Sequence, residues 1–127
     1  MHIVVTGGTG FLGSRLAREL LTGGMLPPAG QAARPVTKLT LIDRAPASPD
    51  LVADERVTVI RGDLVELFDN VATARDILAD AELIFHLAAA VSGECEADFD
   101  LGLRANLQAT QALLAACRAA RPAQVAN

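Results

Sequence analysis

The chain has 127 residues, of which 51% are apolar and 20% are charged, a balance that indicates one folded domain and excludes disorder and repeat arrays. Its formal net charge is -4, and eleven Lys and Arg are scattered among fifteen Asp and Glu. Because these residues form no basic stripe, we expect no nucleic-acid partner.

The first part of the chain is predicted to form a strand, a tight turn and a helix. Residues 2–6 are a short β-branched run followed by glycines, which predicts a buried parallel strand. Leucines at spacings of four, four and one predict an amphipathic helix that ends at Gly23-Gly24. Residues 25–37 contain three prolines and a glycine, so we expect an exposed loop there.

Two further strands follow this loop. Residues 39–42 (Leu-Thr-Leu-Ile) predict a strand that ends at Asp43, and residues 57–60 (Val-Thr-Val-Ile) predict another that ends at Gly62-Asp63. Between them, residues 45–56 contain proline and aspartate with little helical pattern. We therefore expect a connection without a helix in this segment.

The last part of the chain is predicted to be mostly helical. Residues 69–79 have a helical period and lead into a fourth strand at residues 83–87, and residues 88–96 predict a turn. The longest predicted helix runs from about Phe99 to Ala120, with Pro122 ending it. Its apolar stripe is predicted to consist of Leu103, Leu107, Thr110, Leu114 and Cys117.

The order strand, helix, strand, strand, helix, strand, helix is typical of right-handed parallel crossovers. The fold class that fits this order is α/β, a Rossmann-type doubly wound parallel sheet that stops after its fourth crossover. No repeat, low-complexity tract or linker interrupts the sequence. Residues 1–127 are therefore predicted to be one domain.

The most informative motif is the segment Thr6–Gly13, which lies between a predicted strand and a predicted helix. Gly7 supplies backbone angles that a Cβ forbids, Gly10 keeps a side chain away from a pyrophosphate, and Gly13 lets the helix pack close to the strands. Free N–H groups and the positive end of the helix dipole attract a diphosphate without any Lys or Arg. The segment therefore predicts a dinucleotide site.

Asp43 ends the second long strand, where a carboxylate accepts hydrogen bonds from the ribose hydroxyls of an adenosine. It follows Gly13 by 30 residues instead of about 20, and the proline-rich loop accounts for the difference. Because a carboxylate repels a 2′-phosphate, NAD is favoured as the cofactor. Arg44 leaves NADP open as the alternative, and Asp43 can also be interpreted as a solvated turn residue.

Asp63 and Leu64 follow the third strand, at the carboxyl edge of the sheet where the ligands of such folds lie. The Asp63 carboxylate is a candidate acceptor for the amino group of an adenine, and Leu64 offers a backbone N–H. A structural interpretation stays open beside this one, because Asp63 is also suited to be the N-cap of the following segment.

With these motifs, the chain resembles the N-terminal part of an extended short-chain dehydrogenase/reductase of the NAD-dependent epimerase/dehydratase family. The residues that carry the resemblance are the glycine segment, Asp43, Gly62-Asp63-Leu64, Phe85-His86-Leu87-Ala88-Ala89, and Asn106 followed by Thr110. Within the family, residues 91–102 are similar to the corresponding segment of the D-erythronate dehydrogenases. The resemblance implies that residues 1–127 are a NAD(P)-binding Rossmann domain.

The resemblance also implies a role for residues on the glycine segment and the first three strands. Phe11 and Leu12 would present backbone N–H groups to the pyrophosphate. Asp43 would hold the adenosine ribose, and Asp63 and Leu64 would fix the adenine.

The fourth strand and the last helix would supply the other contacts. Leu87, Ala88 and Ala89 would line the passage to the nicotinamide ribose, where small side chains allow close approach. Asn106 would face the active site from the long helix, and an exposed Asn without such a role is the alternative. His86 is interpreted as a packed strand residue and not as a catalytic base.

The catalytic groups of the family are absent from the sequence. In the family, a hydride moves between substrate and nicotinamide while a Tyr, its pKa lowered by a Lys four residues later, exchanges a proton and a Ser or Thr polarises the same oxygen. The sequence has no Tyr, and its one Lys is Lys38, so no catalytic residue is assigned and independent enzyme activity stays open. We expect a fragment, an early-terminated product or an incomplete sequence, without the catalytic half and substrate domain, rather than a protein that works without catalysis.

Three functions follow from these observations. The first is the NAD-binding part of an oxidoreductase that transfers a hydride from a small sugar acid, such as D-erythronate, to NAD. The second is part of a nucleotide-sugar epimerase or dehydratase, in which the hydride returns to the substrate. The third belongs to another class, a non-catalytic module that senses a dinucleotide or serves as a scaffold.

The remaining expectations concern metals, location and assembly. Cys95 and Cys117 have no metal-ligand spacing, so no metal site is predicted. The N-terminus lacks the pattern of a secretory signal, and the apolar run at residues 83–91 is far shorter than the roughly 20 residues of a bilayer helix. We therefore expect a cytoplasmic protein with no membrane partner, and the open edge of the fourth strand favours homo-oligomers.

Overall fold

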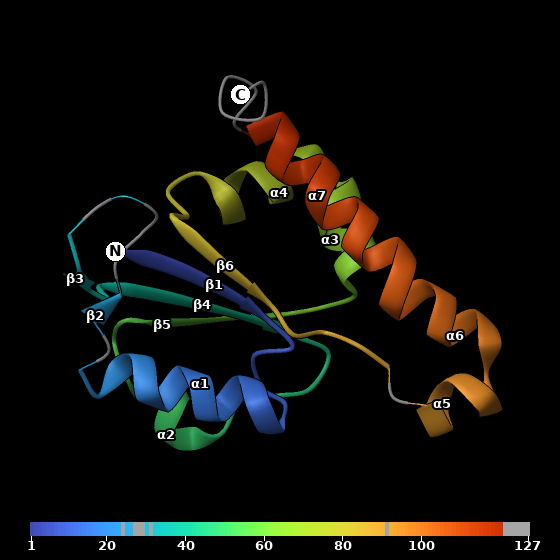
Figure 1. The fold of residues 1–127 in the computed structure, drawn as a ribbon, viewed down its shortest axis with the longest axis horizontal. Helices are drawn as coiled ribbons and strands as arrows, with labels where there is room; N and C mark the ends of the chain where they lie inside the picture. Colours follow the sequence, from blue (N-terminus) through green and yellow to red (C-terminus); the bar gives the residue numbers. More distant parts are fainter. Residues whose placement is uncertain (24, 27–29, 31, 91, 121–127) are drawn as a thin grey trace. The chain divides into compact units, whose positions relative to one another are not determined.

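The structure is a computed structural model that describes residues 1–23, 25–26, 30, 32–90 and 92–120 (Figure 1). The chain folds into two compact units. The first consists of Met1–Arg61 and Asp80–Leu87, and the second of Gly62–Ala79 and Ala88–Asn127. None of the helices in the described residues is long and apolar enough to span a membrane.

The first unit is built on a parallel sheet of four strands in the order β5-β4-β1-β6 (Figure 1). The strands are β1 (His2–Thr6), β4 (Lys38–Asp43), β5 (Val57–Arg61) and β6 (Leu83–His86). Every residue of β1 is buried, which explains why this central strand consists almost entirely of β-branched and apolar residues.

Two helices of the first unit accompany this sheet. α1 (Phe11–Leu21) follows β1, and α2 (Pro49–Val52) lies between β4 and β5 in the sequence. α1 buries Gly13, Ala17 and Leu20 on one face, which confirms its amphipathic pattern. The core combines apolar side chains from the strands and both helices: Ile3, Val5, Ala17, Leu20, Leu39, Leu41 and Leu51.

A parallel sheet flanked by helices is the Rossmann-like α/β fold that the sequence predicts. All four predicted strands are present, and their ends differ from the predicted ends by one residue at most. These strands were predictable because each is a short β-branched or apolar run with turn-forming residues next to it.

Two segments of the first unit that were expected to be irregular contain regular structure. Within residues 25–37, β2 (Met25–Leu26) pairs antiparallel with β3 (Arg34–Pro35), so the prediction of a plain loop is wrong there. α2 lies in the predicted helix-free connection and has Pro49 in its first turn after the extended Ser48. A helix of four residues is too short to show a period in the sequence. The predicted helix stop at Gly24 lies outside the described residues.

The described part of the second unit is helical. Its elements are α3 (Leu64–Asp69), α4 (Val71–Leu78), α5 (Ser92–Ala97), α6 (Phe99–Leu103), the π-helical segment η1 (Arg104–Gln108) and α7 (Ala109–Ala120). In Figure 1, α6 and α7 form one long rod, and α3 and α4 lie beside α7. The predicted long helix is therefore present over its full length, and Pro122 lies outside the described residues.

Two boundaries in the second unit differ from the prediction. The predicted helix at residues 69–79 begins at Val71, and a separate helix, α3, precedes it. The break lies at Asn70, whose extended backbone ends α3 and whose side chain accepts a hydrogen bond from the Thr73 N–H at 3.0 Å. α5 occupies residues 92–97, where a turn was expected, and Glu94 in its first turn complements the helix dipole.

The buried face of the long helix also differs from the predicted stripe. Leu103, Leu107 and Leu114 are exposed, with 37%, 48% and 63% of their surface accessible. The buried residues of α7 are instead Ala109, Ala112, Leu113 and Ala116. The prediction followed the largest apolar side chains, whereas the close approach of α7 to α3 and α4 favours small ones.

A pair of neighbouring leucines tests which face of α7 is buried. Leu113→Ala should lower the free energy of unfolding by about 2–4 kcal/mol, because it removes a side chain that is 4% exposed. Leu114→Ala is the matched control and should change the stability by less than about 0.5 kcal/mol. Urea unfolding followed by circular dichroism measures both. A larger loss in Leu114→Ala than in Leu113→Ala would contradict the observed face.

Candidate functional site

The glycine turn connects β1 to α1 in the first unit. Gly7 has a φ of +68°, in the left-handed region that a Cβ disfavours, which confirms the reason given for a glycine at this position. Its N–H donates to the carbonyl oxygen of Ile42 at 2.8 Å, so the turn is attached to the end of β4. The Gly10 N–H donates back to the Gly7 carbonyl oxygen at 3.2 Å and closes the turn.

Two other glycines of the turn are required by close packing. A Cβ on Gly13 would lie 2.1 Å from the Gly7 carbonyl oxygen, so only a glycine lets the first turn of α1 pass this close. A Cβ on Gly8 would lie 2.9 Å from the Leu41 Cβ. Gly13 is required by close packing, but the backbone that it approaches is that of Gly7 and Gly8 in the turn and not that of a strand. The role of Gly8 was missed although it belongs to the same motif.

The N-terminal end of α1 has no side-chain cap. Gly10 precedes the helix in an extended conformation, and no side chain accepts a hydrogen bond from the first turn. Among the described residues, no hydrogen bond uses the N–H groups of Phe11, Leu12 or Gly13. The side chains of Phe11 and Leu12 are mostly exposed, so this end of the helix dipole can attract an anion from solution.

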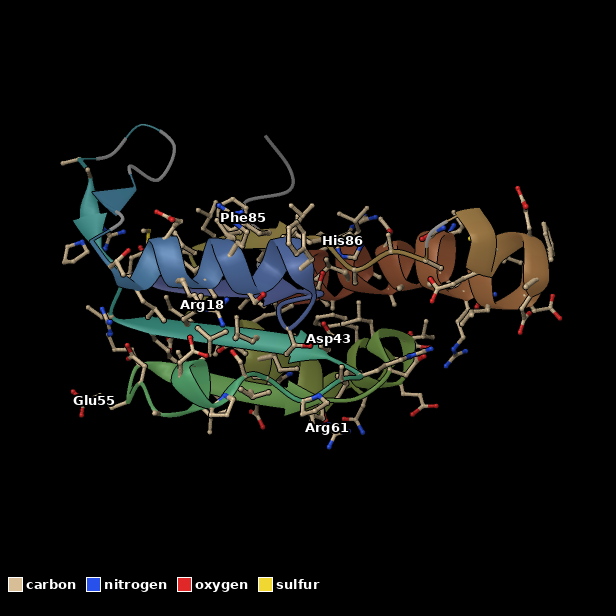
Figure 2. The ribbon with its side chains drawn as sticks, turned by 90° about the horizontal axis from the view of Figure 1, so that it is seen from below. Arg18, Asp43, Glu55, Arg61, Phe85 and His86 are labelled. Carbon is tan, nitrogen blue, oxygen red and sulfur yellow. The ribbon has the colours of Figure 1, made fainter. Side chains whose placement is uncertain are left out.

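Asp43 lies at the carboxyl end of β4, next to the glycine turn (Figure 2). Its Oδ2 accepts a hydrogen bond from the Thr9 N–H at 3.1 Å, and its Oδ1 accepts one from the Arg44 N–H at 2.7 Å. The Thr9 hydroxyl donates to the Ala45 carbonyl oxygen at 3.3 Å. These bonds hold the half-buried carboxylate in one orientation beside the uncapped helix, and the bond from the Arg44 N–H is typical of an Asp in a turn.

The carboxyl end of β6 lies next to the end of β1. His86 Nδ1 is 2.6 Å from Thr6 Oγ1, and burial lowers the pKa of the imidazole, so His86 is a packed strand residue as interpreted. The Leu87 N–H donates to the Thr6 carbonyl oxygen at 3.0 Å. This bond places Leu87 immediately beyond β6, at the same edge of the sheet as the glycine turn.

In the second unit, Asp63 is the N-cap of α3. Its Oδ1 accepts hydrogen bonds from the N–H groups of Val65 at 2.9 Å and Glu66 at 3.3 Å, which is the structural interpretation that the sequence left open. The side chain of Leu64, the first residue of α3, is buried. Arg104 was missed by the sequence reasoning, and it binds the Asp63 carboxylate with both Nε, at 3.0 Å, and Nη2, at 2.9 Å. The hydrogen bonds that Arg104 donates to Asp63 raise the pKa of Arg104, which keeps this guanidinium charged.

Asn106 lies in η1 and holds the backbone of Ala90. Its Oδ1 accepts a hydrogen bond from the Ala90 N–H at 2.8 Å, and its Nδ2 donates to the Ala90 carbonyl oxygen at 3.1 Å. The pair fixes the end of the segment that contains Ala88 and Ala89. Asn106 is exposed, yet its amide has a defined structural partner in a π-helical turn, a feature frequent at functional sites.

The predicted site residues therefore fall into two groups, one in each unit. In the first unit, hydrogen bonds and close contacts bring the glycine turn, the start of α1, Asp43 and Leu87 to one edge of the sheet. In the second unit, Asp63 and Asn106 are each fixed, and Arg104 and Asn106 belong to the same helical segment.

Known proteins are similar to this chain along most of its length. Residues 3–127 match the NAD dependent epimerase/dehydratase family. D-Erythronate dehydrogenase of Cupriavidus necator is 48% identical over 118 residues, a match that covers 93% of this chain and 35% of the relative. The chain thus spans about a third of the length of this curated relative.

Solved structures of the same kind share the fold. The nucleoside-diphosphate-sugar epimerase from Agrobacterium tumefaciens has a TM-score of 0.74 and 37% identity, over 96% of this chain and 33% of its own. A double mutant of the dTDP-glucose 4,6-dehydratase DesIV from Streptomyces venezuelae, with NAD bound, has a TM-score of 0.76 and 28% identity, over 94% of this chain and 36% of its own.

The packing role of Gly13 can be tested against that of Gly10. Gly13→Ala should lower the free energy of unfolding by at least about 2 kcal/mol, because its Cβ would meet the Gly7 carbonyl oxygen at 2.1 Å. Gly10→Ala is the control, since its Cβ would meet that oxygen at 3.4 Å from an extended backbone, and it should cost less than about 0.5 kcal/mol. Thermal unfolding measures both variants. Equal stability of the two would show that the close approach at Gly13 does not constrain the turn.

Proposed function

This chain belongs to the NAD-dependent epimerase/dehydratase family, and on that basis we propose that it is the NAD-binding part of an oxidoreductase resembling D-erythronate dehydrogenase. The observation that carries the proposal is the uncapped start of α1. There, the N–H groups of Phe11, Leu12 and Gly13 and the half-buried carboxylate of Asp43 lie at one edge of the sheet.

The start of α1 is the proposed site of the NAD diphosphate. The backbone N–H groups of Phe11 and Leu12 donate to phosphate oxygens, and the helix dipole adds a favourable field. Gly10 supports this assignment, because the space around its Cα holds no side chain that would keep a phosphate from the helix. No cationic side chain is needed for this mode of binding.

Asp43 is the proposed partner of the adenosine ribose. Its bonds to Thr9 and Arg44 fix the carboxylate, and an anion accepts hydrogen bonds from both ribose hydroxyls. The same charge repels a 2′-phosphate, which favours NAD over NADP. Arg44 is the residue on which a preference for NADP would depend.

The other contacts of the NAD site are proposed from the family. Asp63 and the Leu64 N–H bind the adenine, and Leu87, Ala88 and Ala89 lie along the nicotinamide ribose. Asn106 serves the site through Ala90, whose backbone it holds.

The chemistry of the proposed reaction comes from the cofactor. Bound NAD supplies a hydride acceptor, and residues of this chain bind and orient it. The sequence contains no Tyr, so the proton transfer that accompanies hydride transfer is assigned to no residue of this chain. The proposed substrate of the whole protein is a small sugar acid such as D-erythronate, which the 48% identity to D-erythronate dehydrogenase supports.

A nucleotide-sugar epimerase or dehydratase is the second candidate. The likeness to the dTDP-glucose 4,6-dehydratase DesIV, whose structure has NAD bound, favours it at the level of the fold. The higher sequence identity to D-erythronate dehydrogenase places it second. A non-catalytic dinucleotide sensor is the third candidate, and it alone requires no Tyr and Lys elsewhere in the protein.

Location and assembly are further parts of the proposal. Cys95 and Cys117 form no disulfide, which supports a reducing compartment such as the cytoplasm. A homo-oligomer is proposed from the sequence expectation alone, and neither a nucleic acid nor a membrane is proposed as a partner.

Titration with NAD tests the diphosphate site. The unmodified chain should release or absorb heat with NAD in isothermal calorimetry, and Gly10→Ala should bind NAD at least about tenfold more weakly, because its methyl group occupies the space of the diphosphate. The unfolding measurement above shows whether this variant retains its fold. The proposal fails if a folded chain gives no binding heat, or if Gly10→Ala binds as tightly as the unmodified chain.

Substitutions at Asp43 test the choice of cofactor. The unmodified chain should bind NADH more tightly than NADPH, and Asp43→Ala should weaken NADH binding about tenfold. Asp43→Asn keeps the acceptor for the Thr9 N–H but loses the charge, so it should gain affinity for NADPH. Fluorescence titration of both reduced cofactors gives the ratios. Tighter NADPH binding by the unmodified chain, lost in Arg44→Ala, would instead establish NADP.

A further inference from the structure

Arg104 has no role in the NAD site proposed above, although it binds one of its residues. We propose that Arg104 is a positioning residue for cofactor recognition: its guanidinium sets the plane of the Asp63 carboxylate that meets the amino group of the adenine. The inference rests on the proposed function, because it is there that Asp63 is assigned to the adenine.

The hydrogen bonds of Asp63 divide into two kinds. The N-cap bonds from Val65 and Glu66 both reach Oδ1, so these two bonds hold one oxygen of the carboxylate. The bonds from Arg104 reach both oxygens, with Nε on Oδ2 at 3.0 Å and Nη2 on Oδ1 at 2.9 Å. A planar fork that bonds to both oxygens fixes the carboxylate plane as well as its position.

The surroundings of the pair indicate that Arg104 bonds to Asp63 in preference to its other acidic neighbour. The Asp63 side chain is 14% exposed and that of Arg104 is 37% exposed, so water competes less for this ion pair than for one on the open surface. Glu66 is also near Arg104, but the separation is 3.7 Å and the Glu66 side chain is 77% exposed. The guanidinium is thus held mainly by Asp63.

Arg104 lies in the same helical segment as Asn106, another residue of the proposed site. Arg104 and Asn106 both belong to η1, so one π-helical segment holds the Asp63 carboxylate and the backbone of Ala90. Arg104 is 41 residues from Asp63 in the sequence, and nothing in a helical pattern would assign it to a nucleotide site. The orientation of the Asp63 carboxylate therefore depends on η1, and no residue of η1 is proposed to contact the adenine.

A pair of dinucleotides that differ in the hydrogen-bonding edge of the base tests the inference. In nicotinamide hypoxanthine dinucleotide, a carbonyl oxygen replaces the adenine amino group of NAD and the neighbouring ring nitrogen N1 carries a hydrogen. A carboxylate oriented toward the amino group of NAD therefore meets an acceptor in place of a donor, and a backbone N–H directed at N1 meets a donor in place of an acceptor. The unmodified chain should bind NAD at least about tenfold more tightly than this analogue in calorimetry. Arg104→Met should reduce that ratio to about threefold or less, because Asp63 keeps its cap but loses its fixed plane.

Two further variants separate positioning from folding and from charge. Arg104→Lys keeps the charge but lacks the fork, so its preference for NAD over the analogue should also fall below that of the unmodified chain. If Arg104→Met does not fold, Arg104→Lys replaces it as the test. Arg56→Met is the matched control, because Arg56 binds Asp54 with the same two nitrogens at 3.0 and 2.7 Å and is 36% exposed. Arg56→Met should prefer NAD over the analogue as strongly as the unmodified chain does.

Each outcome of this experiment decides between named possibilities. If folded Arg104→Met or Arg104→Lys prefers NAD over the analogue as strongly as the unmodified chain does, the role of the guanidinium fork is overturned. If Arg56→Met loses as much of this preference as Arg104→Met, the effect is not specific to Arg104, and the inference is overturned as well. Tight NAD binding without discrimination in the unmodified chain refutes the adenine contact of Asp63 and the inference with it. Absence of binding to either dinucleotide refutes the proposed function itself, which distinguishes that failure from a failure of Arg104 alone.

Discussion

The close approach between the start of α1 and the carbonyl oxygen of Gly7 is the constraint on which the candidate site depends. At Gly13 a single additional carbon would lie 2.1 Å from that oxygen, so the geometry exists only without a side chain there. The approach directs the first N–H groups of α1 to the edge of the sheet where β1 and β4 end. Asp43 then closes the arrangement through its bond to Thr9, which joins the turn to the neighbouring strand.

The polar groups of the candidate site are each fixed by at least two hydrogen bonds. Asp43 bonds to the backbone of the turn and of its own strand end, and Asn106 bonds to both backbone groups of Ala90. Asp63 combines an N-cap with a guanidinium fork. Two anchors fix direction as well as position, which a binding group needs when its ligand is recognised by hydrogen bonds.

Local features were predictable from the sequence, whereas contacts between distant segments were not. The left-handed angle of Gly7 and the strand at residues 2–6 follow from neighbouring residues, so the turn and the sheet could be inferred. The pairing of Asp63 with Arg104 spans 41 residues and leaves no local pattern. The buried face of α7 was hard to predict for another reason. Leu114 is large and apolar yet exposed, because helices that pack closely bury small side chains, and the sequence does not show how closely they pack.

The route of the chain through its two units has a consequence for dissecting the molecule. Strand β6 belongs to the first unit, yet it stands in the sequence between the two segments of the second unit, Gly62–Ala79 and Ala88–Asn127. A polypeptide cut after Arg61 would retain three of the four strands of the parallel sheet and lose the pairing of β1 with β6. No single cleavage point separates the units, so a polypeptide that contained one unit alone would need a new junction between its two segments, from Arg61 to Asp80 or from Ala79 to Ala88.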